Sequence, residues 1–140
     1  MTILILAAIL AAGPVDIWTG AELKSGSGAL TAEAQTKGLA GKTFGAASLW
    51  RRAKSGQAEL HKTKTDLIVI EEGSATLVFG GVIPDAHPTQ ANEIRGSSIR
   101  GGESRKLAPG DVVRIPANTP HQFVLDQGQS VAYFALKLAR

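Results

Sequence analysis

The sequence predicts an all-β fold of short strands separated by tight turns. Its 140 residues include 16 glycines, above the average share of about 7%, together with scattered Pro, Asn and Asp. Short runs rich in β-branched and aromatic residues recur between these turn residues, and this spacing favours a sandwich or barrel over alternating strands and helices. With 44% apolar residues, the chain can bury a core as one domain.

The first residues form an apolar run, MTILILAAILAAG, which is shorter than the roughly 20 residues that span a bilayer. The run ends in small residues that suit signal-peptide cleavage, although no Lys or Arg precedes it. We therefore expect residues 1–13 to be an export signal, with a misassigned start or a buried N-terminal element as the alternative. Cleavage predicts a periplasmic or secreted protein with no stable membrane insertion, and otherwise the protein is cytoplasmic.

Residues 14–43 are expected to lead into the β domain, which we place at 44–140. The first part of this segment mixes Trp with Gly and Ser without a clear period, so it is expected to be extended. Residues 29–37, ALTAEAQTK, have a helical pattern, with Thr31 as the N-cap and Gly38 as the stop. The sequence thus predicts one short N-terminal helix.

Seven runs in the remaining chain have the composition of strands. They are ASLWRR at 47–52, QAELH at 57–61, DLIVIEEG at 66–73, SATLVFGG at 74–81, DVVRIP at 111–116, HQFVLD at 121–126 and SVAYFALKL at 130–138. Between Gly81 and Lys106 lies a long polar excursion. Segments of this length are often functional, but a mobile surface hairpin around NEIRGSSI is an equally good interpretation, and His87 within it is expected to be solvated.

The composition excludes several classes of site. The chain has no cysteine, so disulfides, Cys-ligated zinc, iron–sulfur clusters and thiol nucleophiles are ruled out. The net charge is +3 and the isoelectric point about 9.5, but the basic residues are spread among comparable numbers of acids. No aromatic residues are interleaved with them for base stacking, so we expect no nucleic-acid partner.

Three polar residues near 60 can share one face of the predicted sheet. Glu59 and His61 have the same parity on a strand, so their side chains point the same way. The polar KTKT that follows suits a turn, which resets the register so that Asp66 again faces inward. Leu67 and Val69 then face outward, which implies a cover such as the N-terminal segment or a second subunit.

A second segment places another imidazole at the end of a strand. One strand is expected to end at Pro116, a tight turn follows through Asn118, and a new strand begins at His121. This strand puts His121 and Phe123 on one face. Asn tolerates a positive φ better than other non-glycine residues, so it suits the turn.

These segments resemble the two motifs of the cupin superfamily. The second motif runs Gly, five residues, Pro, one residue, Gly, two residues, His, and is matched by Gly110, Pro116 and His121, with Asn118 where Gly is usual. The first runs His, one residue, His, three or four residues, Glu, six residues, Gly, and its positions are occupied by Glu59, His61, Asp66 and Gly73. Glu thus replaces the first His, and Asp replaces the Glu.

The resemblance implies a cupin-type β-barrel, or double-stranded jelly roll, that forms a homodimer and holds one divalent metal ion. The implied metal ligands are His61, His121, Asp66 and Glu59. Imidazole nitrogen and carboxylate oxygen suit Mn, Fe, Ni, Cu or Zn without choosing among them. Two alternatives stay open, because Glu59 can instead pair with Arg51 or Arg52, and the side chain of Asp66 is shorter than that of Glu.

Two functions follow from this resemblance. The first is a metal-dependent enzyme of dioxygenase, isomerase or lyase type that acts on a small oxygenated molecule. The second is a non-catalytic protein that binds or senses a small molecule such as a sugar or organic acid. The catalytic residues are unknown, and Tyr133 and Glu72 are the only candidates for an acid or base.

Overall fold

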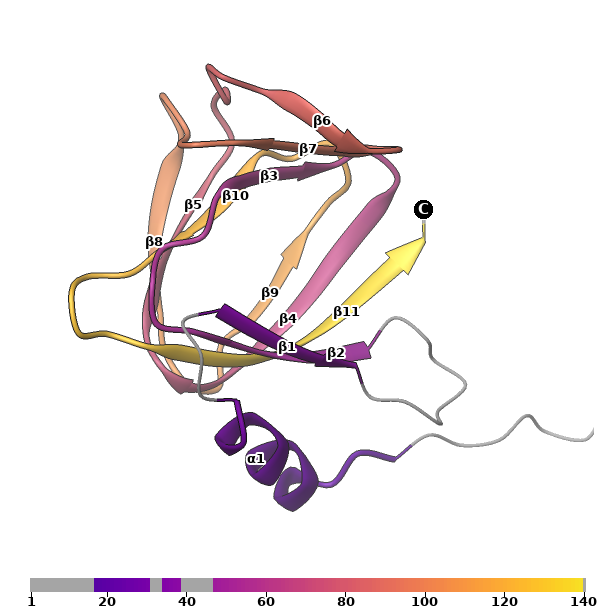
Figure 1. Ribbon diagram of the computed structural model, residues 1–140, viewed down its shortest axis with the longest axis vertical. Helices are drawn as coiled ribbons and strands as arrows, with labels where there is room; N and C mark the ends of the chain where they lie inside the picture. Colours follow the sequence, from indigo (N-terminus) through magenta and orange to yellow (C-terminus); the bar gives the residue numbers. More distant parts are fainter. Residues whose placement is uncertain (1–16, 31–33, 39–46, 140) are drawn as a thin grey trace, which may run out of the picture.

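The computed structural model describes residues 17–30, 34–38 and 47–139 (Figure 1). Two antiparallel sheets face each other, and one helix, α1 (Gly20–Gly28), lies outside the first sheet. This arrangement confirms the predicted all-β jelly roll with a short helix. Residues 1–13, and with them the expected export signal, lie outside the described residues. Within those residues, no helix is long and apolar enough to span a membrane.

The two sheets combine strands that are distant in the sequence. The first sheet has the order β1-β2-β11-β4-β9, with bounds β1 (Ala34–Gly38), β2 (Ala47–Arg52), β11 (Val131–Ala139), β4 (Lys64–Gly73) and β9 (Val112–Ile115). The second has the order β6-β7-β3-β10-β5-β8, with bounds β6 (His87–Gln90), β7 (Glu93–Gly96), β3 (Ala58–His61), β10 (His121–Val124), β5 (Ala75–Phe79) and β8 (Glu103–Leu107). The seven predicted strands are all present, with ends within two residues of the expected ones.

The core lies between the sheets. Alternation along β4 turns Ile68 and Ile70 inward, as expected from a period of two. Across the sandwich, the ring of Tyr133 stacks on Phe123 at a centroid distance of 5.0 Å and on Trp50 at 6.1 Å. These aromatic contacts join both sheets beside the polar centre described below.

A second apolar cluster covers the outer face of the first sheet. Leu49 and Phe134 are buried there, and Trp18, Leu23 and Val69 pack against them. Trp18 precedes α1 and Leu23 lies within it. The expectation that the N-terminal segment covers Val69 is therefore confirmed.

The position of the predicted helix was wrong. Helix α1 lies in the stretch that was expected to be extended, whereas part of 29–37 forms β1, which pairs with β2 and ends at Gly38. Thr19 and Glu22 form a capping box at the start of α1, in which each side chain accepts a hydrogen bond from the backbone N–H of the other. Thr31, the expected N-cap, lies outside the described residues. Pairing with an adjacent strand outweighed the local helical pattern in 29–37.

The polar excursion after Gly81 is structured as strands. It contains β6, β7 and the start of β8, and β6 and β7 form a hairpin that turns at Asn92, whose φ is 64°. The carboxylate of Asp85 accepts the backbone N–H of Ser97 at 2.9 and 3.0 Å. The segment therefore contains a hairpin, and β7 lies next to β3, where it brings Glu93 into the interior.

Candidate metal centre

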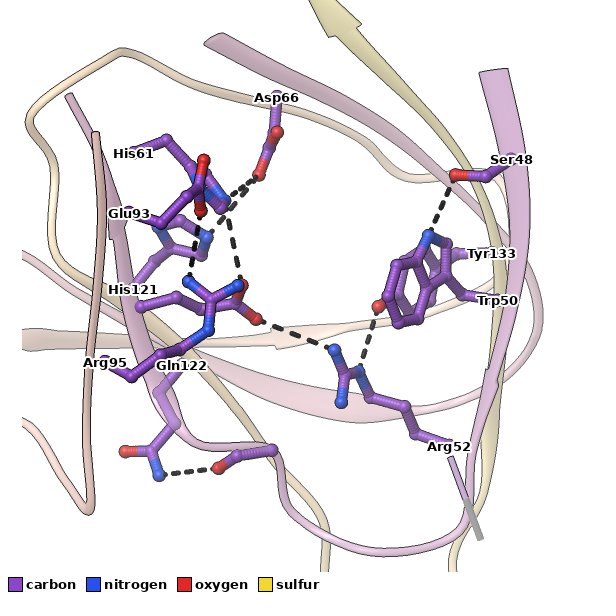
Figure 2. Close-up of polar contacts among 12 residues, drawn as sticks. Ser48, Trp50, Arg52, His61, Asp66, Glu93, Arg95, His121, Gln122 and Tyr133 are labelled. Atoms are coloured by element: carbon purple, nitrogen blue, oxygen red, sulfur yellow. Dashed lines mark hydrogen bonds and ion pairs between the residues drawn. The ribbon is translucent and has the colours of Figure 1, made fainter. Parts of the chain in front are cut away.

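The four predicted ligands come together between the two sheets (Figure 2). Strand β3 carries Glu59 and His61, and β10 places His121 directly opposite Glu59. Asp66 enters from β4 of the other sheet, because the turn between β3 and β4 resets the register as expected. Both imidazoles and Asp66 are buried. The structure thus brings together the predicted set, whose role as ligands stays a prediction.

The donor atoms of these residues face a common point. The carboxylate Oδ2 of Asp66 lies 3.2 Å from Nε2 of His61 and 3.5 Å from Nε2 of His121. Glu59 Oε2 lies 3.7 Å from Nε2 of His61. The ligand atoms of Glu59, His61 and His121 all lie within 4.8 Å of one another, so these three side chains can hold one metal ion.

Hydrogen bonds on the far side of each imidazole fix its orientation. Nδ1 of His61 lies 2.5 Å from Oε2 of Glu93, and Nδ1 of His121 lies 2.9 Å from the carbonyl oxygen of Thr119. A carboxylate and a carbonyl can only accept, so Nδ1 carries the proton in both rings. Each Nε2 therefore presents its lone pair to the shared centre, which is the arrangement that metal-binding imidazoles use.

The turn before His121 links the two sequence motifs. Asn118 has a φ of 63°, so it adopts the left-handed conformation expected of the residue that replaces Gly. Its backbone N–H donates to the carbonyl oxygen of His61 at 2.8 Å. The end of β3 is thereby fastened to the start of β10, and the two imidazoles are held next to each other.

Three basic side chains surround the centre. The guanidinium of Arg95 pairs with the carboxylate of Glu59 at 3.2 Å and with that of Glu93 at 3.3 Å. Nζ of Lys137 lies 2.8 Å from Oδ1 of Asp66. Arg52 contacts the other oxygen of Glu59 at 3.6 Å. Every carboxylate at the centre therefore has a cationic partner.

Arg51 and Arg52, adjacent on β2, point to opposite faces of the sheet. Of the two partners considered for Glu59, Arg52 is the one that contacts it. Arg51 instead binds the carbonyl oxygen of Ser27 and the carboxylate of Glu72 at 2.9 Å. Glu72 thus lies on the α1 side of the sheet, away from the centre, and is not placed to act as its acid or base.

The carboxylate of Asp66 is ionised, so it stabilises positive charge at the centre. Burial raises the pKa of its carboxyl, but the neighbouring side chains of His121, His61 and Lys137 outweigh burial and hold the pKa well below its usual range. Burial lowers the pKa of His61, and the neighbouring carboxylate of Asp66 raises it by more. An ionised, buried carboxylate therefore faces both imidazoles.

A cavity of about 70 Å³ opens beside the centre. One wall is polar and includes Asp66 and His121, and the other is aromatic, with Trp50, Phe123 and Tyr133. These aromatic residues pack in the core and also line the cavity. The volume has room for about two water-sized groups next to the ligand atoms.

The hydroxyl of Tyr133 is held at the edge of this cavity. It accepts a hydrogen bond from Nε of Arg52 at 2.9 Å, and the guanidinium lies over the Trp50 ring, 5.0 Å from its centroid (Figure 2). Burial raises the pKa of Tyr133 to about 12, so the hydroxyl keeps its proton at neutral pH. Of the two expected acid or base candidates, Tyr133 lies at the cavity and Glu72 does not.

Nothing in the sequence patterns pointed to Glu93, Arg95 or Lys137. Glu93 and Arg95 stand in the polar excursion, which shows little apolar periodicity. Lys137 lies near the end of a strand whose pairing partner is 71 residues away. The alternation of β11 is the one signal that could have found it, because Tyr133, Ala135 and Lys137 share a parity.

Comparisons with known proteins identify the fold. No family model matches the sequence, and no curated protein matches it. Among solved structures, the polyketide cyclase RemF from Streptomyces resistomycificus is 22% identical with a TM-score of 0.53, over 75% of this chain and 64% of the cyclase. The plu4264 protein from Photorhabdus luminescens is 10% identical with a TM-score of 0.54, over 77% of each chain. The chain therefore has a cupin fold, and it spans less than two thirds of the length of the cyclase.

Proposed function

We propose that this chain is a small member of the cupin superfamily that binds one divalent metal ion through His61, His121, Asp66 and Glu59. The observation that carries the proposal is the convergence of Nε2 of His61 and Nε2 of His121 on one carboxylate oxygen of Asp66, at 3.2 and 3.5 Å. Two ligands of one ion, with bonds of about 2.1 Å in tetrahedral geometry, lie about 3.4 Å apart. The side chains therefore fit an ion without rearrangement of the backbone.

The donor set indicates which ions suit the centre. Two imidazole nitrogens and two carboxylates favour Mn, Fe, Ni, Cu or Zn, and the lack of thiolates makes a closed structural zinc site unfavourable. Such an ion would polarise a bound carbonyl or enolate oxygen, or activate water. The cavity beside His121 and Asp66 gives a ligand access to that position.

The charges around the centre favour an anionic ligand. Three carboxylates face three basic side chains, so their formal charges cancel; the residues are Glu59, Asp66, Glu93, Arg52, Arg95 and Lys137. A divalent ion adds a charge of +2, so the centre becomes net positive with or without the ammonium group of Lys137. A small oxygenated anion, such as a carboxylate or an enolate, would neutralise it. Such an anion is a suitable substrate for an enzyme of dioxygenase, isomerase or lyase type and equally a suitable ligand for a binding protein, and Tyr133 lines the cavity beside the centre.

A second candidate function is binding or sensing without catalysis. It is favoured by the stacked wall of Trp50, Tyr133 and Phe123 together with four protein side chains around the ion, which leave little freedom for a reacting group. Turnover of small carboxylates by the metal-loaded protein distinguishes the two candidates. Retention of an unchanged ligand supports the binding protein, and appearance of a product supports the enzyme. The homodimer stays a prediction from the resemblance.

Metal retention by the wild-type protein tests the proposed function. The protein is incubated separately with Mn, Fe(II), Ni, Cu and Zn, desalted and examined by elemental analysis. We expect about one ion per chain for at least one of these metals, because the ligands are preorganised and buried. Protein that is metal-free after all five incubations would overturn the proposal.

Glu93 is expected to tune the affinity for the metal. Glu93→Ala removes the acceptor that orients His61 and fixes its tautomer, so we expect metal binding to weaken by about 10- to 100-fold. Competition with a chelating dye measures the change. Glu103→Ala on β8, where the side chain is exposed, is the matched control and should leave the affinity unchanged. Equal affinities of Glu93→Ala and wild type would contradict the role of Glu93.

A further inference from the structure

We infer that the ammonium group of Lys137 occupies Nε2 of His61, one of the metal-binding atoms of the centre. A metal ion can then bind only after this ammonium group withdraws. The inference rests on the proposed function of the centre. It concerns Lys137, which lies outside both sequence motifs. The contacts of the ammonium with His61 and Asp66 carry it.

The register of the first sheet delivers the ammonium to the centre. Lys137 on β11 is directly opposite Asp66 on β4. Opposite residues of an antiparallel pair project on the same side, and Tyr133 and Ala135 on the same strand line the cavity together with Lys137. The position of Lys137 is therefore set by strand pairing.

The ammonium and a metal ion compete for one lone pair. Lys137 Nζ lies 2.8 Å from Nε2 of His61 and 2.8 Å from Oδ1 of Asp66. Nδ1 of His61 donates its proton to Glu93, so Nε2 has a single lone pair, and an ammonium can only donate. His61 can bind Lys137 or a metal ion at this atom, but not both.

The exchange is possible without moving the sheet. The side chain of Lys137 is 34% exposed, whereas that of Asp66 is 8% exposed. A flexible four-carbon stem lets the ammonium swing toward solvent while Asp66 stays in place. In the metal-free protein the ammonium group of Lys137 pairs with the buried carboxylate of Asp66. In the metal-bound protein the metal ion pairs with this carboxylate instead. A buried unpaired charge is avoided in both states.

Metal affinity of a variant without the ammonium tests the inference. Lys137→Met keeps the stem and removes the charge, and Lys106→Met makes the same change at an exposed position on β8. With Zn²⁺ and a competing dye, we expect Lys137→Met to bind at least about tenfold more tightly than wild type and Lys106→Met to match wild type. Equal or weaker binding by Lys137→Met overturns the inference and leaves the proposed function standing. Absence of Zn²⁺ binding in all three proteins overturns both.

A second measurement uses the wild-type protein and does not depend on the folding of a variant. Acetylation of each lysine by an amine-reactive ester is followed by mass spectrometry with and without saturating Zn²⁺. We expect acetylation of Lys137 to increase severalfold with the ion, because the released ammonium no longer donates to His61 and Asp66, while Lys106 is unaffected. An unchanged rate at Lys137 with the ion bound overturns the inference.

Discussion

Replacing both His61 and His121 by alanine is expected to abolish binding of the metal ion. The two Nε2 atoms are the neutral nitrogen donors of the centre, and only Glu59 and Asp66 remain without them. Those carboxylates already pair with basic side chains, so they would bind an ion weakly. The loss should exceed the roughly 10- to 100-fold effect of removing an outer partner of a ligand. Elemental analysis after desalting and dye competition measure it.

His87→Ala is the matched control for this pair. His87 is the third histidine of the chain, and it is exposed at the start of β6 with its Nδ1 3.0 Å from the carbonyl oxygen of Asp85. Its removal should leave the bound metal at about one ion per chain. His61→Gln with His121→Gln keeps polar atoms in the interior, so it separates loss of the ion from loss of folding, which circular dichroism reports. Retention of the ion by a folded double variant would remove the basis of the proposed function.

The strands could be predicted because their signals are local. Strand β2 matches its predicted bounds, since it is a short run with aliphatic and aromatic residues at its centre. Strand β4 was found from its run of β-branched residues. Helix α1 was not predicted because its segment mixes Gly and Ser with other residues without a clear period; the informative signal is Thr19 followed three residues later by Glu22.

The first part of the centre could also be predicted from local spacing. His61 and His121 lie at fixed distances in the sequence from the turns next to them. Their place on the strand can therefore be predicted without knowing how the strands pair. Glu93 and Lys137 could not be placed in this way, because their partners are 32 and 71 residues distant and depend on strand pairing. Strand order across two sheets is a property of the whole chain, so the residues that complete the centre emerge only from the fold.

Replacing Gly73 by alanine is expected to destabilise the protein strongly. Gly73 has a φ of +71°, and a Cβ there would lie 1.9 Å from the carbonyl oxygen of Ser130. That oxygen also accepts the N–H of Ser74 at 3.1 Å, so it cannot move away freely. Left-handed strain and backbone overlap together should lower the free energy of unfolding by about 2 to 5 kcal/mol. Urea denaturation followed by tryptophan fluorescence measures the change.

Gly80→Ala separates the two causes. Gly80 has nearly the same φ, +74°, but nothing lies within 4 Å of the Cβ that alanine would add. This variant should therefore lose only the conformational part, about 1 to 2 kcal/mol. If both variants lose the same amount, close approach to Ser130 does not explain why this position of the motif is glycine. A larger loss at Gly73 means that contact with Ser130, directly before β11, excludes a side chain at one end of the strand pairing that also places Asp66 opposite Lys137.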